Sequence, residues 1–162
     1  MFPTRRITTS GGDVYRDQYS LVFDGTDEYL VIGDHADYDI TDDITMMCWV
    51  KPAATDAQWL MGKGDGSSQN YNLAINGSTK FNHDFYVSGT GHTVTSTTDV
   101  VAGVWYHVVI TREKSSGTHV MYVNGVAEDI DTDSTSSIYN DDVGFTIGAR
   151  DNKSLDFEVN IS

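Results

Sequence analysis

Short apolar runs that alternate with polar residues, separated by turn residues, constrain the fold of this chain more than any other feature from Ser20 onward. A period close to two places successive side chains on opposite faces of a strand, and the spacing of an amphipathic helix is hard to find. The predicted strands are Leu21–Phe23, Tyr29–Ile32, Ile44–Val50, Trp59–Met61, Tyr71–Ile75, Phe81–Val87, His92–Thr97, Trp105–Thr111, Val120–Val123, Val126–Ile130, Phe145–Gly148 and Leu155–Ile161. About a dozen short strands at regular spacing predict an all-β fold, a two-sheet antiparallel sandwich.

Two Asn-Gly pairs mark predicted hairpins. Asn76-Gly77 and Asn124-Gly125 are each flanked by strand-like runs. Asn-Gly favours a two-residue type I′ turn, because both residues tolerate positive φ. The glycine-rich stretch Gly62–Asn70 is predicted to be a loop.

The first residues differ from the rest of the chain. They contain glycine and proline without a periodic apolar face, so we expect an irregular N-terminal arm at residues 1–18 and a single domain at residues 19–162. Arg5, Arg6 and Arg16 make this arm basic within an acidic protein. Such an extension is suited to docking on an acidic surface of a neighbouring subunit, although a frayed terminus is the commoner case.

The chain is strongly acidic, with 24 Asp and Glu against 10 Lys and Arg and a net charge of −14 over 162 residues. Negative charge repels phosphates and anionic lipid heads, so we expect no nucleic-acid partner and no membrane insertion. No apolar run is long enough to span a bilayer, and no hydrophobic region follows the arginine pair, so we expect no signal peptide. Cys48 is the one cysteine and forms no internal disulfide.

Five segments in order carry a family resemblance. They are Ser20–Leu30, Ile44–Pro52, Gly103–Thr111, Met121–Val126 and Phe145–Gly148. Together they resemble laminin-G-like jelly-roll domains of the concanavalin A-like lectin/glucanase superfamily, over about residues 19–150. The resemblance implies a jelly-roll sandwich and a structural place for His107. Trp49 and Trp105 lie inside strand signatures and are predicted to be core residues.

The resemblance implies a non-catalytic recognition module, which binds a glycan or a protein partner through loops at one end of the sandwich. Laminin-G-like domains also occur on phage tail and capsid proteins, so the alternative is a structural or decoration subunit of a virion or another assembly. A glycoside hydrolase is the third and most remote hypothesis. It rests on Glu128–Asp133, where Asp129, Asp131 and Asp133 share a strand face. We expect no enzyme, because the run lacks a second glutamate at the spacing that paired catalytic carboxylates need, and interpret it as a solvated acidic strand end.

Aromatic faces stack on sugar C–H surfaces, whereas amides and carboxylates bind sugar hydroxyls. The predicted ligand-binding residues are therefore Trp59, Tyr71, Phe85 and Tyr86, with Tyr139 as a further aromatic and Asn72, Asn82, His83 and Asp84 as polar partners. Calcium is a candidate cofactor, since pentraxins and several laminin-G-like domains bind it with loop oxygens. The predicted metal ligands are Asp65, Asn70, Asp151 and Asn152.

Overall fold

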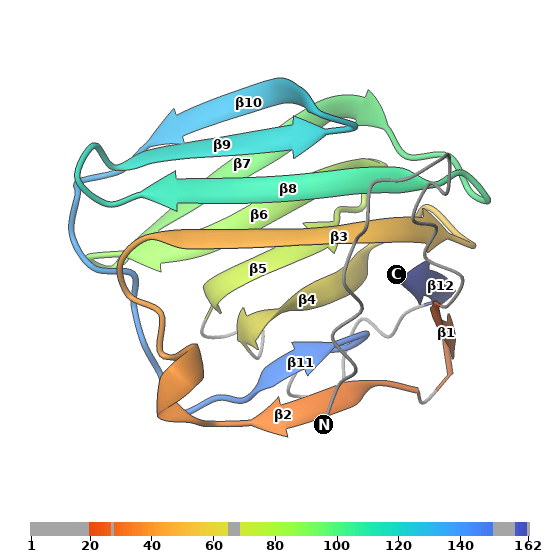
Figure 1. The fold of residues 1–162 in the computed structure, drawn as a ribbon, viewed down its shortest axis with the longest axis horizontal. Coiled ribbons are helices and arrows are strands. Elements are labelled where there is room, and N and C mark those ends of the chain that lie inside the picture. Colours follow the sequence, from red (N-terminus) through yellow and green to blue (C-terminus); the bar gives the residue numbers. More distant parts are fainter. Residues whose placement is uncertain (1–19, 27, 65–68, 151–157, 162) are drawn as a thin grey trace, which may run out of the picture.

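Two six-stranded antiparallel sheets pack face to face in a computed structural model, which describes residues 20–26, 28–64, 69–150 and 158–161 (Figure 1). The front sheet has the order β1 (Leu21–Asp24), β12 (Glu158–Ile161), β3 (Ile44–Pro52), β8 (Tyr106–Glu113), β9 (Thr118–Val123) and β10 (Val126–Thr132). The back sheet has the order β2 (Leu30–Gly33), β11 (Phe145–Ile147), β4 (Gln58–Gly64), β5 (Gln69–Ile75), β6 (Lys80–Val87) and β7 (Thr90–Asp99). One short 3-10 turn, η1 (Ala36–Tyr38), joins β2 to β3. The predicted all-β sandwich is confirmed, and within the described ranges no helix is long and apolar enough to cross a bilayer.

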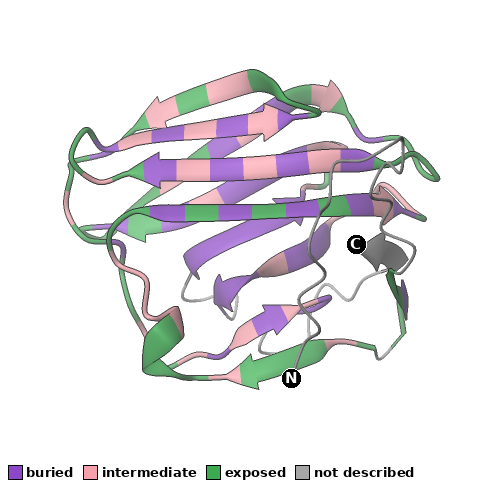
Figure 2. Ribbon diagram, in the orientation of Figure 1, coloured by how far each residue is buried: buried purple, intermediate pink, exposed green. Residues whose placement is uncertain are grey.

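Strand β3 shows how the alternating pattern builds the core. Ile44, Met46, Cys48 and Val50 are buried, and the residues between them point outward, so the strand alternates purple and green in Figure 2. Its partner β8 follows the same rule, with Cys48 paired to a buried Val108. Burial in the apolar core raises the pKa of the Cys48 thiol to about 12, so this cysteine acts as a small apolar side chain.

The two tryptophans predicted to be core residues are not in the core. Trp49 is 50% exposed and Trp105 is 40% exposed. Trp49 follows buried Cys48 and precedes buried Val50, so the pleat directs its ring outward, where it lies 5.0 Å from the His107 ring. Trp105 precedes β8, whose first residue, Tyr106, takes the inward position.

The two predicted hairpins have different turns. Asn124 and Gly125 have φ values of 51° and 80° and join β9 directly to β10, so the two-residue turn with two positive φ angles is confirmed. The Asn76 turn instead has four residues before β6 begins, and Gly77 is not among the residues with positive φ. The Asn76 side chain accepts hydrogen bonds from the backbone N–H groups of Ser78 and Lys80, which stabilises the wider loop.

Acidic side chains of β10 seal the edge of the back sheet. Asp129 Oδ2 accepts from the Thr95 backbone N–H at 2.8 Å, and Glu128 accepts from the Thr98 backbone N–H at 2.8 Å. Unpaired backbone N–H groups at the edge of a sheet can otherwise form hydrogen bonds with strands of other chains. The interpretation of residues 128–133 as a solvated strand end is therefore wrong. Glu128, Asp129 and Asp131 contact β7 of the neighbouring sheet, and Asp133 binds Arg112 in the core.

A tight contact at Gly117 predicts a large mutational effect. Gly117 has a φ of +66°, and a Cβ added there would lie 2.5 Å from the Asp133 backbone oxygen. We expect Gly117→Ala to lower the free energy of unfolding by more than 2 kcal/mol, with both backbone strain and overlap contributing. Gly125→Ala is the matched control, because Gly125 has a φ of +80° and open space around it. Its expected loss is about 1 kcal/mol, and equal losses in urea unfolding would contradict the close approach.

Candidate functional site

Several of the predicted polar residues meet on the outer face of the back sheet, which points away from the viewer in Figure 1. Directly paired residues of neighbouring strands project to the same face. Trp59 pairs with Ala74 and Ala74 pairs with Asn82, so these three form a row across β4, β5 and β6. Asp84 and Thr93 form the next row on β6 and β7, two residues or about 6.6 Å further along the strand.

Asp84 is the polar centre of this face. Thr93 Oγ1 donates to Asp84 Oδ1 at 2.7 Å, and Asn82 Nδ2 donates to Asp84 Oδ2 at 2.7 Å. Asn72 adds a weaker donor at 3.4 Å and accepts from the Asp84 backbone N–H at 3.0 Å. These bonds fix the orientation of a partly exposed carboxylate, which keeps further acceptor capacity for a ligand hydroxyl.

Tyr86 lies two residues from Asp84 on β6, and a second half-exposed tyrosine, Tyr139, lies on a segment that pairs with the end of β6. Tyr86 pairs with Gly91, and a Cβ added to Gly91 would lie 3.2 Å from the Tyr86 ring, so this ring rests on glycine backbone. The Tyr139 backbone N–H donates to the Tyr86 carbonyl at 2.7 Å, next to the bridge between buried Val87 and Ile138. Tyr86 and Tyr139 therefore share the outer face, with exposed fractions of 38% and 48%.

The Trp59 end of the same face is closed. Trp59 is fully buried, and the Arg150 guanidinium carbon lies 5.4 Å from the centroid of its ring. Trp59 Nε1, Arg150 Nε and Asn82 Oδ1 are buried without a hydrogen-bond partner among the described residues. The accessible part of the face is therefore the end that carries Tyr86, Asp84 and Thr93.

Three other predicted site residues face the core. Tyr71 is 1% exposed, and Phe85 and His83 are fully buried. Tyr71 pairs with Phe85, and the Phe85 ring lies 3.5 Å from the His119 ring of the front sheet. Tyr71 and Phe85 thus offer no open surface for sugar stacking, because the pleat turns them into the sandwich. Of the predicted aromatic ligand residues, Tyr86 and Tyr139 keep an exposed face, and Trp59 shares that side but is covered.

A buried ionic cluster lies between the sheets. Asp133 Oδ2 accepts from Arg112 Nε at 2.8 Å and contacts His119 Nε2 at 2.7 Å, and all three side chains have no exposed surface. Burial lowers the pKa of His83 to about 3 and also lowers the pKa of His119, although Asp133 opposes the second shift. A histidine beside a carboxylate is suited to acid–base chemistry, but this cluster has no access for a substrate. Its groups instead bind one another and the loops.

Lys63 is a second buried charge, and it lies in the stretch Gly62–Asn70, which the sequence predicts to be a loop. Strand β4 continues through Gly62 and Gly64, so residues 62–64 are not part of a loop. The Lys63 ammonium has no exposed surface; it donates to Asp34 at 2.9 Å, to Asn140 at 3.0 Å and to Asp39. Burial lowers the pKa of Lys63, but the two carboxylates outweigh it, so the pKa lies above its usual value.

The predicted calcium ligands fall mostly outside the described residues. Asp65, Asp151 and Asn152 lie there, and only Asn70 can be placed. Asn70 is buried, and its Nδ2 lies 3.4 Å from Asn140 Oδ1. Within the described ranges, no group of three or more His, Cys, Asp or Glu side chains is arranged to hold a metal ion. The calcium site stays a prediction.

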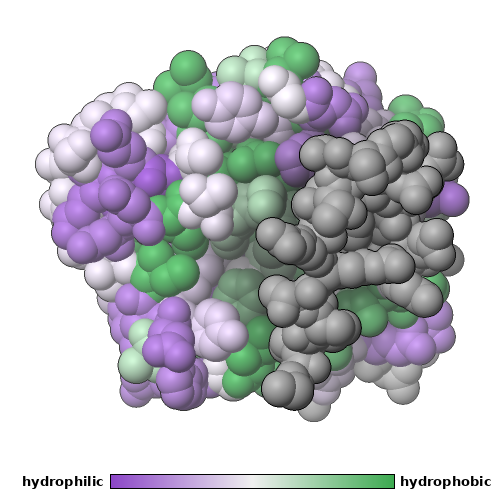
Figure 3. All heavy atoms as spheres, viewed as in Figure 1, coloured by the Kyte–Doolittle hydropathy of each residue, from purple (hydrophilic) through white to green (hydrophobic). Residues whose placement is uncertain are grey.

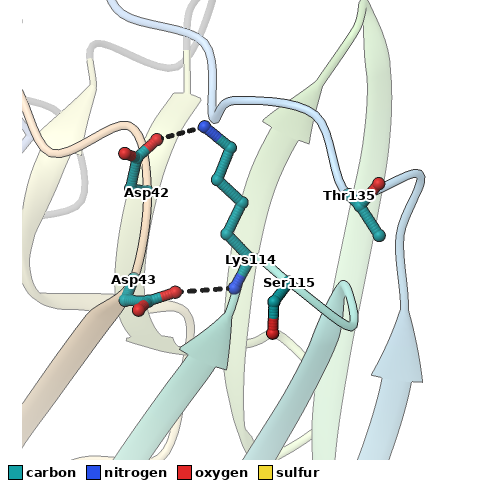
Figure 4. Close-up of a pocket in the computed structure, with 5 residues that line it drawn as sticks. All are labelled: Asp42, Asp43, Lys114, Ser115 and Thr135. Carbon is teal, nitrogen blue, oxygen red and sulfur yellow. Dashed lines mark hydrogen bonds and ion pairs between the residues drawn. The ribbon is translucent and has the colours of Figure 1, made fainter.

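Two hollows lie elsewhere on the molecule. One, of about 380 Å³, lies at the loop end beside Lys114, whose backbone N–H donates to Asp43 at 2.7 Å and whose ammonium binds Asp42 (Figure 4). Hydrogen bonding from Lys114 lowers the pKa of Asp42. The other, of about 320 Å³, is apolar and lies beside β3, where Figure 3 shows a recessed hydrophobic area; Met46, Met61 and Phe145 are among its lining residues. No aromatic side chain lines the first hollow. Tyr38, Tyr71 and Phe145 line the second, where the Tyr71 hydroxyl already donates to the Tyr38 carbonyl at 2.7 Å.

Comparison with known proteins gives a family and a fold. Residues 24–162 match a family model described as the concanavalin A-like lectin/glucanases superfamily. Comparison with curated proteins finds no match. The fold is similar to the CBM40 module of a Ruminococcus gnavus IT-sialidase, solved with α2,3-sialyllactose bound, with a TM-score of 0.64 and 13% identity over 83% of this chain and 89% of that one.

Two further structures share the fold over part of longer chains. A putative carbohydrate-binding protein from Bacteroides ovatus has a TM-score of 0.69 and 17% identity, over 88% of this chain and 41% of that one. Domains LG4-5 of the mouse laminin α1 chain have a TM-score of 0.66 and 12% identity, over 91% of this chain and 43% of that one. This chain thus spans less than half of either structure, and identities this low show a common fold alone.

Lys63 should be more important for stability than an exposed lysine. We expect Lys63→Met to lower the free energy of unfolding, because it leaves Asp34 and Asp39 without their cation. Lys80→Met is the matched control, since Lys80 forms an ion pair with a largely exposed Asp99. Urea unfolding at neutral pH should show a loss at least roughly twice that of the control. Equal losses would mean that the Lys63 cluster is effectively solvated.

The buried histidines predict acid sensitivity. His83 is neutral in the folded chain down to a pKa of about 3, whereas the unfolded chain protonates it near the ordinary histidine pKa of 6.5. The unfolded state therefore binds more protons below that value, and stability falls as pH falls. His83 alone should remove about 1.4 kcal/mol between pH 7.5 and pH 5.5. His83→Gln should flatten this slope in urea titrations, and a slope equal to that of the unsubstituted chain would refute the assignment.

Proposed function

Because the chain belongs to the concanavalin A-like lectin/glucanases superfamily, we propose that it is a non-catalytic module that binds glycans on the outer face of its back sheet. The binding site is the accessible end of that face, formed by Tyr86, Asp84, Thr93 and Tyr139. Sugar C–H surfaces stack on Tyr86, and sugar hydroxyls donate to Asp84.

This proposal rests on the distance along β6 between the aromatic ring of Tyr86 and the oriented carboxylate of Asp84. Tyr86 and Asp84 are two residues apart on β6, which separates them by about 6.6 Å along one face. This is close to the width of one pyranose ring, so a sugar stacked on Tyr86 brings a hydroxyl to Asp84. The Tyr86 ring rests on Gly91, and Thr93 and Asn82 orient the carboxylate, so both groups are in place before binding.

The structural neighbours support a binding role. One is solved with α2,3-sialyllactose bound, and another is described as a putative carbohydrate-binding protein. The acidic residues that suggested catalysis are used internally, since Asp129 binds β7 and Asp133 binds Arg112. Among the described loop carboxylates, Lys63 binds Asp34 and Asp39, and Lys114 binds Asp42. These ion pairs favour the sheet face over the loops as the site.

A second function, as a subunit of a virion or another assembly, has support from the other sheet. Met47 is 65% exposed and Trp49 is 50% exposed on the outer face of the front sheet. Exposed large apolar side chains of this kind are typical of protein interfaces. A concentration-independent oligomer in light scattering would favour this function.

Two aromatic variants distinguish the two faces. We expect Tyr86→Ala to lower the affinity for bound glycans at least tenfold, because the stacking surface is lost. Trp49→Ala removes a more exposed aromatic ring from the front sheet and should retain binding. Glycan titration followed by NMR, with calcium and with chelator, measures both effects and tests calcium assistance. Loss of binding in Trp49→Ala with retention in Tyr86→Ala would move the site to the front sheet.

A further inference from the structure

We propose that this sheet face selects neutral, hydroxyl-rich glycans and rejects anionic ones such as sialylated, uronic or sulfated sugars. The inference rests on the proposed function and adds the ligand class. It differs from what the sialyllactose-bound neighbour would suggest, and the reasons lie in the donors, acceptors and charges around Tyr86.

The first reason is the balance of donors and acceptors. The Thr93 hydroxyl and the Asn82 amide both donate to Asp84. The Asp84 carboxylate, whose two side-chain donors at 2.7 Å are both neutral, therefore keeps acceptor capacity toward the exposed side. A neutral sugar supplies hydroxyl donors to that carboxylate. A carboxylate or sulfate group offers acceptors only, so it finds no complementary partner at Asp84.

The second reason is the set of neighbouring acidic residues. Asp129 and Glu128 bind the backbone of β7, the strand that carries Thr93. Asp131 contacts His92 on the same strand at 2.9 Å. With Asp84 these residues place four carboxylates around β6 and β7, within a chain whose net charge is −14. An anionic sugar arriving at Tyr86 is repelled by this field, whereas a neutral one is not.

The third reason is where the cations are. Lys63, Lys80, Arg112 and Lys114 each form an ion pair with an aspartate in the described structure. Lys51 lies on β3 of the front sheet. Arg150 is the remaining described cation on this side, and it is stacked on Trp59 in the closed part of the face. None of the described cations is therefore beside Tyr86 and Asp84 to hold an anionic group.

A printed array of matched neutral, sialylated and sulfated glycans tests the inference. It includes lactose beside α2,3- and α2,6-sialyllactose, probed with the full chain. We expect every bound glycan to be neutral, and its sialylated or sulfated counterpart to bind at least tenfold more weakly. Because the rejection is electrostatic, raising the salt from about 50 to 500 mM should narrow that ratio.

Two variants link the selectivity to Asp84. Asp84→Asn should weaken binding of the neutral glycans at least tenfold and reduce the discrimination against the anionic ones. Glu113→Gln is the matched control, since it removes the same charge from an exposed site on the front sheet and should change neither. Thr93→Val keeps the volume and charge but removes the hydroxyl that orients Asp84, and should also weaken binding. Circular dichroism checks that each variant is folded.

The outcomes separate the inference from the function on which it rests. Tighter binding of sialylated or sulfated glycans than of their neutral forms overturns the inference and leaves glycan recognition standing. If such a preference for anionic glycans is seen and is lost in Arg150→Met, Arg150 binds the anionic group, and the inference is again overturned while glycan recognition stands. Binding to no glycan on the array overturns the proposed function and the inference together. If Asp84→Asn and Thr93→Val both bind neutral glycans as tightly as the unsubstituted chain does, the inference is overturned as well.

Discussion

The buried ion pair between Arg112 and Asp133 is the interaction on which the rest of the structure depends most. Arg112 also donates to the backbone oxygens of Asp42 and Ser136, so one side chain ties β8 to the loops before β3 and after β10. Breaking a pair of this kind leaves an uncompensated charge in the core, which is strongly destabilising. His119 extends the cluster to the Phe85 ring of the back sheet. The two sheets are thereby positioned against each other at this end, and with them the strand that carries Tyr86 and Asp84.

Asp133, Asp129 and Asp84 have three different roles, which follow from how far each one is buried and from its hydrogen-bond partners. Asp133 is fully buried and needs both Arg112 and His119, which help to lower its pKa against the effect of burial. Asp129 lies at the junction of the sheets and accepts from a backbone N–H of β7, where it closes an edge. Asp84 is oriented by neutral donors at a partly exposed position and has no described cation beside it. Of these three arrangements, the last one leaves a carboxylate free to accept from a ligand, and this distinction is the basis for proposing recognition on the back sheet.

Sequence patterns predicted the positions of the strands well, but they predicted poorly which face of each strand points toward the core. The alternation located β3 and β8 within two residues, and Asn124-Gly125 specified its turn, because these signals depend on neighbouring residues alone. The inward face depends on the opposing sheet. Tyr71 and Tyr86 are both tyrosines on predicted strands, yet one is buried and the other open. Both faces of strand β5 are buried, so its sequence does not show which of its residues point toward the core. For Trp49 the signal was present, since the alternation of Met46, Cys48 and Val50 defines the inward face, but its place inside a strand signature suggested the core. Thr93 and Lys63 were missed because their importance comes from partners distant in sequence.

The distribution of lysines explains why recognition on a sheet face is the better-supported arrangement for this chain. At the loop end, Asp42 is bound by Lys114, and Asp34 and Asp39 are bound by Lys63. An ammonium group there neutralises carboxylates that would otherwise attract a divalent cation, so among the described residues the loops offer internal ion pairs rather than an open set of oxygens. Asp84 needs no cation to hold its geometry, because a hydroxyl and an amide already do so. A carboxylate oriented by neutral donors keeps acceptor sites for the sugar that we propose, and Tyr86, two residues away on the same strand, supplies the aromatic ring beside those sites.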